Sequence, residues 1–240
     1  MDNKKLDKQT KCSINYFKKS DTLKLVGGGV LIAGLVCLWL GWGIVGFVLA
    51  FIGTPVGFVL FLIGSTGRFT DADMDSDINS KMAGLAIDID QNHSYQLKLL
   101  KHVKEITIEG YIFNDDVMLK KQKSGSIRSS EFSRSKIRIL SDRLYIVNRN
   151  ISLIYDDQTV NNLYELPYDS IQNVEVVREE KRIVFNKNTF FVKPCSLKIV
   201  TDSETYSLPC ADALTSDEVV TSINRQLKVY KEQQSSNQAH

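Results

Sequence analysis

The feature that most constrains this chain is a run of 43 residues, Leu25 to Gly67, that contains no Asp, Glu, Lys, Arg or His. One helix needs only ~20 residues to cross a hydrocarbon layer of ~30 Å, so the run is too long for one span and fits two. Gly41-Trp42-Gly43 lies at its midpoint, where Trp39 and Trp42 cluster as tryptophans do at a membrane–water interface. We therefore expect two transmembrane helices, at about 23–41 and 44–66.

The charges that flank this run predict its orientation. Residues 1–24 contain seven lysines and three aspartates, whereas the turn at the midpoint carries no charge. Lysine and arginine accumulate on the cytoplasmic side, so residues 1–22 are predicted to be a basic cytoplasmic segment. The run is also too long for a signal-peptide core. We expect an uncleaved, multi-pass protein of the cell membrane with both termini in the cytoplasm.

Small residues form a stripe on one face of the second predicted helix. The stripe comprises Gly46, Ala50, Gly53, Gly57 and Gly64. Small residues let helix backbones approach closely, so the stripe is expected to pack the two helices together or to bind an oligomer partner or another membrane helix. No ionisable group lies inside the run, which argues against a transporter or pump formed by this chain alone.

Residues 67–104 are predicted to be an acidic, amphipathic helical linker. Met74, Ile78, Met82 and Leu85 recur at helical spacing and predict a helix at about 71–86. The alternating aspartates at its start resemble the beginning of a calcium-binding loop. However, no register offers the Gly at position 6 and the Glu at position 12 that such a loop uses. Acids in a first turn favour the helix dipole, so we expect no metal here.

From about residue 105 the sequence changes to short β-branched and aromatic runs separated by turn residues. The expected strands are 105–113, 136–140, 143–148, 151–155, 171–177, 182–185, 190–192, 197–201 and 205–208. Apolar residues from Leu214 to Tyr230 then repeat near helical period. The predicted fold class is α+β: a transmembrane helical hairpin, then an antiparallel β-barrel or sandwich with a C-terminal helix. A polar tail, 233–240, follows and is expected to fray.

This order of elements resembles the pleckstrin-homology-like (PH-like, GRAM-like) domains of bacteria. Three stretches contribute to the resemblance: Arg143 to Arg149, Leu166 to Val176, and the hairpin Leu197 to Leu208. It covers residues 105–232. The resemblance implies a bent barrel plugged at one end by the C-terminal helix, and a binding module for lipids or proteins rather than an enzyme. The basic, serine-rich stretch 120–136 departs from the compact early hairpin of that family.

That stretch begins the best candidate for a functional surface. Eight bases lie within 24 residues, opposed by two acids: Lys120, Lys121, Lys123, Arg128, Arg134, Lys136, Arg138 and Arg143. Beside an anionic leaflet each base contributes ~1 kcal/mol, so these residues are predicted to bind lipid headgroups or a membrane partner. The alternative is a solvated loop. Nucleic acid is not expected, since the domain as a whole is not strongly basic.

Neither the cysteines nor any catalytic motif indicates an enzyme. With a two-residue turn at Asp202-Ser203, Cys195 falls opposite Cys210 and Leu197 opposite Leu208. We interpret the two cysteines as free, buried thiols rather than a redox pair. The sequence has no HExxH, CxxC, GxSxG or Walker A motif. We therefore predict no enzymatic activity, no cofactor and no metal.

The sequence hypothesis is a non-enzymatic integral membrane protein that presents a cytoplasmic PH-like domain. This domain is expected to bind anionic lipid headgroups or a membrane protein partner, and a homo-oligomer formed through the helices is the other predicted assembly. The alternative is an accessory subunit of a larger membrane complex, docked through the glycine-rich helices.

Overall fold

The computed structural model describes residues 7–18, 22–40, 43–67, 69–83, 85, 102–122, 124–211 and 213–238. The chain forms two compact units, Met1–Thr70 and Asp71–His240, here called the N-terminal and C-terminal units. The fold class is α+β, with antiparallel sheets and a helix near the C-terminus. The linker prediction falls partly on residues 86–101, which lie outside the described residues.

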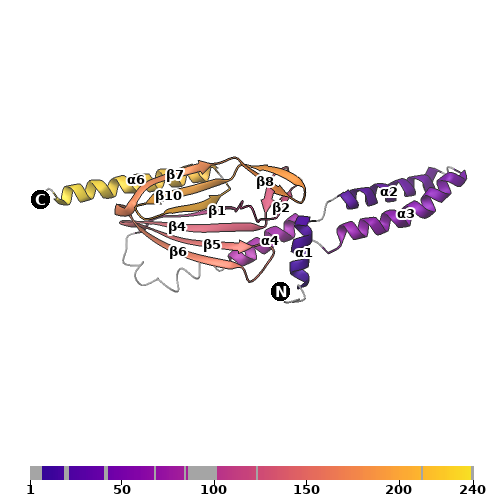
Figure 1. Cartoon of the computed structure of the whole chain (residues 1–240), viewed down its shortest axis with the longest axis horizontal. Coiled ribbons are helices and arrows are strands. Elements are labelled where there is room, and N and C mark those ends of the chain that lie inside the picture. Colours follow the sequence, from indigo (N-terminus) through magenta and orange to yellow (C-terminus); the bar gives the residue numbers. More distant parts are fainter. Residues whose placement is uncertain are drawn as a thin grey trace. The chain divides into compact units, whose positions relative to one another are not determined.

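The N-terminal unit consists of three helices, α1 (Lys8–Lys18), α2 (Thr22–Leu40) and α3 (Gly43–Ser65) (Figure 1). The two apolar helices begin and end within one residue of the bounds predicted for them. Helix α1 was not predicted. It is joined to the end of α3 by a hydrogen bond of 2.7 Å from Asn15 Nδ2 to the Gly67 carbonyl.

Within the described residues, no helix on its own is both long and apolar enough to qualify as a membrane span. One pair, Lys8–Lys18 and Leu23–Cys37, qualifies only jointly, and its two helices meet at an angle of 81°.

The C-terminal unit begins with α4 (Asp71–Met82), which is shorter than the predicted 71–86. Met74, Ile78 and Met82 are all buried. They recur at i, i+4 and i+8, so the apolar stripe read from the sequence is the face that α4 buries. Acids occupy its first turn, as the helix dipole favours.

Two antiparallel sheets make up most of this unit. Sheet A has the order β1 (His102–Tyr111), β4 (Glu131–Leu140), β5 (Arg143–Ser152) and β6 (Thr159–Pro167). Sheet C has the order β11 (Thr205–Cys210), β10 (Cys195–Thr201) and β7 (Ile171–Arg178), and the turn η1 (Tyr168–Ser170) connects the two. Among the described strands the sheets do not close into a barrel, so that part of the prediction is wrong.

Two short hairpins are inserted between these strands. One pairs β2 (Leu119–Lys121) with β3 (Ile127–Ser129), and the other pairs β8 (Lys181–Phe185) with β9 (Asn188–Val192). The long basic segment of the sequence is therefore distributed over β2, β3, β4 and β5 rather than forming one loop. The hairpins share a core that includes Val117, Leu119, Ile183 and Val192.

The main core lies where both sheets meet helix α6 (Ala213–Gln238). The apolar face of α6 supplies Val219, Ile223 and Leu227, and Figure 1 shows the helix running alongside β7 and β10. The helix continues to Gln238, so most of the polar tail predicted to fray is helical. Strand β6 was not predicted, and the strand predicted at 151–155 is the end of β5 and the turn that follows.

Candidate functional site

Helices α2 and α3 pack with their backbones in close contact at glycines. A Cβ atom added at Gly57 would lie 2.6 Å from the Leu31 nitrogen and 2.9 Å from the Gly27 carbonyl oxygen. At Gly64 it would lie 2.7 Å from the Lys24 nitrogen. No side chain fits in such gaps, so these glycines pack α2 against α3.

Only part of the predicted stripe of small residues lies in the contact between α2 and α3. Ala50 is buried with Gly57 and Gly64. Gly53, in contrast, has only Val30 Cγ1 near it, at 3.9 Å from an added Cβ, so its share in the close approach was predicted wrongly. The surroundings of Gly46 lie outside the described residues.

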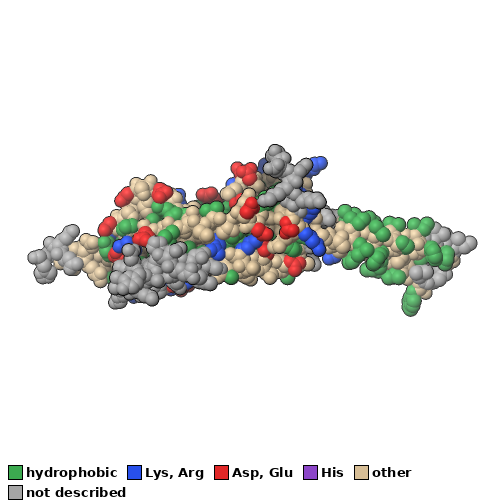
Figure 2. Space-filling view, turned by 90° about the horizontal axis from the view of Figure 1, so that it is seen from below, with side chains coloured by type: hydrophobic (Ala, Val, Ile, Leu, Met, Phe, Trp, Pro, Cys, Tyr) green, Lys and Arg blue, Asp and Glu red, His purple; other side chains and the backbone are tan. Residues whose placement is uncertain are grey.

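Large apolar side chains cover the outside of this helical hairpin. Trp39 is 88% exposed and Phe51 69% exposed, and Leu25, Ile32 and Ile52 are also exposed. Figure 2 shows hydrophobic side chains over the visible surface of the two helices. The small residues are inside and the large apolar residues are outside, the reverse of a water-soluble helical hairpin.

Five of the eight cations predicted to form a binding surface make ion pairs with neighbouring acids. On the outer face of sheet A, Arg134 contacts Glu109 at 2.6 Å, and Lys136 and Arg138 contact Glu105 at 2.6 and 2.7 Å. Burial opposes ionisation of Glu105, but the hydrogen bonds from Lys136 and Arg138 outweigh it and lower the pKa of that carboxyl group. The β1–β4 register thus places an acid beside each of these bases.

Arg128 is the most deeply buried of the eight, with 4% of its surface exposed. Its guanidinium donates to Asp75 Oδ1 at 2.6 Å and to the Asp71 carbonyl at 3.3 Å, so it ties β3 to α4. The guanidinium carbon also lies 5.8 Å from the centre of the Tyr111 ring. Burial raises the pKa of Tyr111 to about 12, against the opposing charge of Arg128.

The remaining cations of the predicted surface differ in their ion pairs and in their exposure. Arg143 contacts Asp142 at 2.8 Å and Glu165 at 3.3 Å. Lys121 is exposed on β2, Lys120 is half-buried on the same strand, and Lys123 lies outside the described residues. The structure therefore does not bring the eight together as one exposed basic surface.

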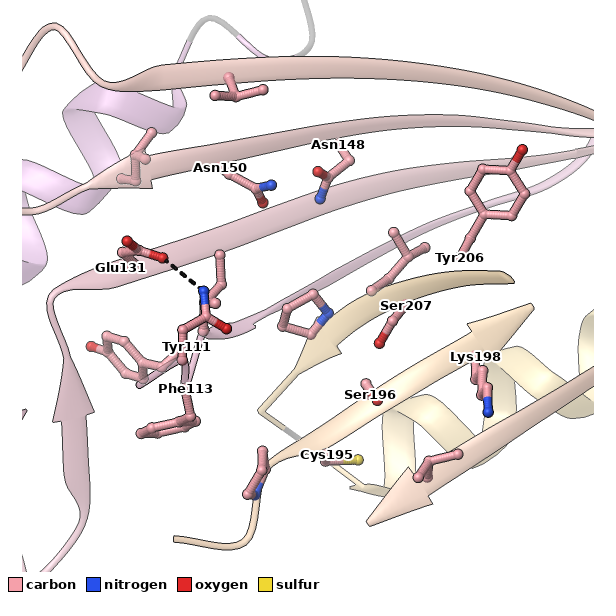
Figure 3. A pocket seen from close by; sticks show the side chains of 18 of the residues that line it. Tyr111, Phe113, Glu131, Asn148, Asn150, Cys195, Ser196, Lys198, Tyr206 and Ser207 are labelled. Atoms are coloured by element: carbon pink, nitrogen blue, oxygen red, sulfur yellow. Dashed lines mark hydrogen bonds between the residues drawn. The ribbon is translucent and has the colours of Figure 1, made fainter. Parts of the chain in front are cut away.

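A cleft of about 1010 Å³ lies between the two sheets (Figure 3). Sheet A contributes Asn148 and Asn150 from β5, and sheet C contributes Ser196, Lys198 and Ser207. The two sheets are joined by a hydrogen bond of 2.6 Å from the nitrogen of Ala211, the residue after β11, to the Glu109 carbonyl of β1. A cavity of this size is in the range of small-molecule sites.

A row of polar side chains lines the sheet A wall of this cleft. Asn148 Nδ2 donates to Ser133 Oγ at 2.7 Å and to Ser135 Oγ at 2.9 Å, and all three are buried. Asn162 Nδ2 approaches Asn148 Oδ1 at 3.4 Å. Within the described part of the chain the buried Asn150 Oδ1 has no hydrogen-bond partner. An unpaired buried acceptor is costly, and here it favours a hydrogen-bond donor in the cleft.

Glu131 lies at the same wall and accepts a hydrogen bond of 3.4 Å from Asn114 Nδ2 (Figure 3). Burial, and then the charge of Asp116, raise the pKa of Glu131. The cleft thus offers amide, hydroxyl and carboxyl groups suited to a polar ligand. This row was not predicted, although the sequence contains a signal for it. Polar residues replace apolar ones at alternate positions of β5, from Leu144 and Ile146 to Asn148 and Asn150.

Cys195 and Cys210 stand opposite each other, as the sequence predicted, with Leu197 opposite Leu208. Both are free thiols, with a sulfur–sulfur distance of 3.0 Å. Burial, together with the hydrogen bond to Cys195, raises the pKa of Cys210 to about 12. A protonated thiol is a poor nucleophile, so the surroundings of Cys210 do not activate it as one. No group of three or more potential metal ligands occurs among the described residues.

Comparison with known proteins gives no relative. No protein-family model, no curated protein and no solved structure matches the chain.

Proposed function

We propose that this chain is a non-enzymatic integral membrane protein in which α2 and α3 form the anchor and the C-terminal unit is a PH-like binding domain. Both termini face the cytoplasm in this proposal. The binding partners are the headgroups of anionic lipids or a protein of the same membrane.

The observation that carries the proposal is the reversed arrangement of the α2–α3 pair. Monomeric soluble proteins rarely expose a continuous apolar patch beyond a few hundred Å², yet large apolar side chains cover both helices. The proposed anchor is the whole uncharged segment from Leu25 to Gly67, which contains most of α2 and all of α3. Its 43 residues are enough for two crossings, because one helix needs ~20 residues to span a ~30 Å hydrocarbon layer.

The order of strands in the C-terminal unit supports the PH-like part of the proposal. Four strands follow one another across sheet A, three across sheet C, and α6 comes last. The apolar face of α6 packs into the core that both sheets share. The β2–β3 and β8–β9 hairpins are additions to this plan.

The alternative function, an accessory subunit docked through its glycines, is less favoured. Gly57 and Gly64 already pack against α2 within the chain. A partner helix would therefore have to contact the exposed aromatic and aliphatic surface instead, including Trp39 and Phe51.

Two measurements test the proposal. After membrane fractionation and washing at pH 11, the full chain should remain in the pellet, because burial of two apolar helices does not depend on charge. A reporter that is active only in the cytoplasm should work when fused to either end. Release by the alkaline wash would refute the anchor, and activity at one end alone would refute the two-crossing topology.

A further inference from the structure

The β8–β9 hairpin has an apolar residue on both of its faces. On the inner face, Ile183 and Val192 are buried in the core that β8 and β9 share with β2. On the outer face, Val184 and Phe191 are each 64% exposed. Opposite residues of an antiparallel pair share a face, and Arg182 lies opposite Phe191. The outer face therefore presents the apolar side chains of Val184 and Phe191 beside the cation of Arg182.

Cations surround these two exposed residues. Arg182, Lys187 and Lys193 are exposed, and among the described residues none of them makes an ion pair. This distinguishes them from Arg134, Lys136 and Arg138 on sheet A. Lys187 occupies the turn, where Asn186 and Lys187 have φ of 49° and 65°, as in the two-residue turns of tight hairpins.

Acids are placed at the other end of the same hairpin. Glu179 and Glu180 directly precede β8, at the base, and the Glu179 nitrogen donates to the Pro194 carbonyl at 3.2 Å. Lys181 is paired with Asp115 at 3.0 Å. The base thus holds the two acids together with Lys181, Arg182 and Lys193, while Lys187 lies at the turn, three positions after the exposed Val184.

We propose that the β8–β9 hairpin docks its outer face and turn on the anionic surface of a lipid bilayer, with Val184 and Phe191 at the headgroup level and Arg182 and Lys187 against lipid phosphates. Aromatic and aliphatic side chains enter the interface while basic residues hold anionic headgroups, as in amphipathic membrane-binding segments. The inference rests on the proposed function, since the anchor holds the domain beside a membrane.

Tryptic cleavage after Lys187 tests the docking in the full chain. The protein is reconstituted into lipid nanodiscs of phosphatidylcholine alone, or of phosphatidylcholine with 30% phosphatidylglycerol. Loop tips are preferred sites of proteolysis, so Lys187 should be cut readily in neutral discs. In anionic discs the cleavage rate should fall about tenfold, and 0.5 M salt should restore it. Cleavage after Lys231 on α6 serves as the internal reference.

Two variants separate docking from a change in the fold. The first, Val184→Ser with Phe191→Ser, leaves the buried inner face intact and should abolish the protection in anionic discs. The second, Arg182→Gln with Lys193→Gln, removes charge alone and should weaken it. The matched control, Val160→Ser with Leu163→Ser, changes side chains that are 54% and 42% exposed on β6 and should leave the protection unchanged.

The outcomes distinguish this inference from the function on which it rests. Failure of the chain to insert into either disc would refute the anchor. Insertion with equal cleavage of Lys187 in both discs, or with equal protection in both, would overturn the docking and leave the anchor standing. Protection that survives the Val184 and Phe191 substitutions would also overturn it.

Discussion

Substituting alanine at two glycines of one helix tests how α2 and α3 pack. At Gly57 the added Cβ would lie 2.6 Å from the Leu31 nitrogen, whereas ordinary contact begins near 3.4 Å. The helices would have to separate by about 0.8 Å, and overpacking of this kind costs ~1–3 kcal/mol. At Gly53 the nearest atom is 3.9 Å away, so alanine adds no clash there.

Gly53→Ala is therefore a matched control, with the same chemistry on the same helix. It replaces a glycine by a better helix former, a change worth up to ~1 kcal/mol in favour of the helix. We expect Gly57→Ala to lower the free energy of unfolding of the N-terminal unit and Gly53→Ala to leave it unchanged or raise it. The sequence pattern alone would have predicted the same effect at both positions.

The assay is a titration of the detergent-solubilised chain with sodium dodecyl sulfate, followed by tryptophan fluorescence. The two tryptophans of the chain, Trp39 and Trp42, both belong to the segment that forms or joins these helices, so the signal reports on this unit. The midpoint should move to lower detergent fraction for Gly57→Ala only. Equal midpoints for the two variants, or a larger loss for Gly53→Ala, would refute the packing described here.

Three further predictions concern the C-terminal unit. Asp75→Ala should lower the free energy of unfolding by about 2 kcal/mol, because the buried Arg128 loses its ion pair with this carboxylate. The control Asp115→Ala removes an exposed ion pair and should change the free energy of unfolding by less than ~0.5 kcal/mol. Equal losses in urea titrations would contradict this. Asn148→Leu should cost ~1–3 kcal/mol, since two buried serines lose their donor, and an unchanged melting temperature would show that the row does not stabilise the sheet. Because the pKa of Cys210 is raised to about 12 from 9, the folded state keeps a proton that the unfolded state loses, so stability should decline as pH rises above 9; this decline should be smaller in Cys210→Ala.

The strands that alternate strictly were foreseeable from the sequence. The hairpin of β10 and β11 was placed in its correct register, with Cys195 opposite Cys210. Strand β6 (Thr159–Pro167) was not, because it is an edge strand whose side chains are mostly exposed and include two adjacent asparagines. Such a strand has neither a continuous apolar face nor high β-propensity. Strands β2 and β3 have three residues each, too few for a period to be visible.

The candidate site was harder to predict because it depends on which strands are neighbours. Arg134 and Arg138 looked unopposed within their own segment. Their acids, Glu109 and Glu105, lie 25 and 33 positions earlier in the chain and reach them only through the β1–β4 register. A local charge count cannot contain this pairing, since a register shift of one residue would turn the bases to the other face of the sheet.

The same reasoning explains why the favoured membrane contact moves to a part of the chain that no charge count selected. Residues 179–193 contain four bases and two acids, a smaller excess than the eight bases and two acids of residues 120–143. Folding brings Arg182 opposite Phe191 on the exposed face of the hairpin and leaves Lys187 at the turn, while the acids directly precede β8. Electrostatic attraction to a surface falls off within a Debye length of ~8 Å, so the charges nearest that surface outweigh the net charge of the segment. The absence of ion pairs at these cations and the exposed apolar side chains beside them, both set by strand pairing, are the features on which the proposed contact with an anionic bilayer rests.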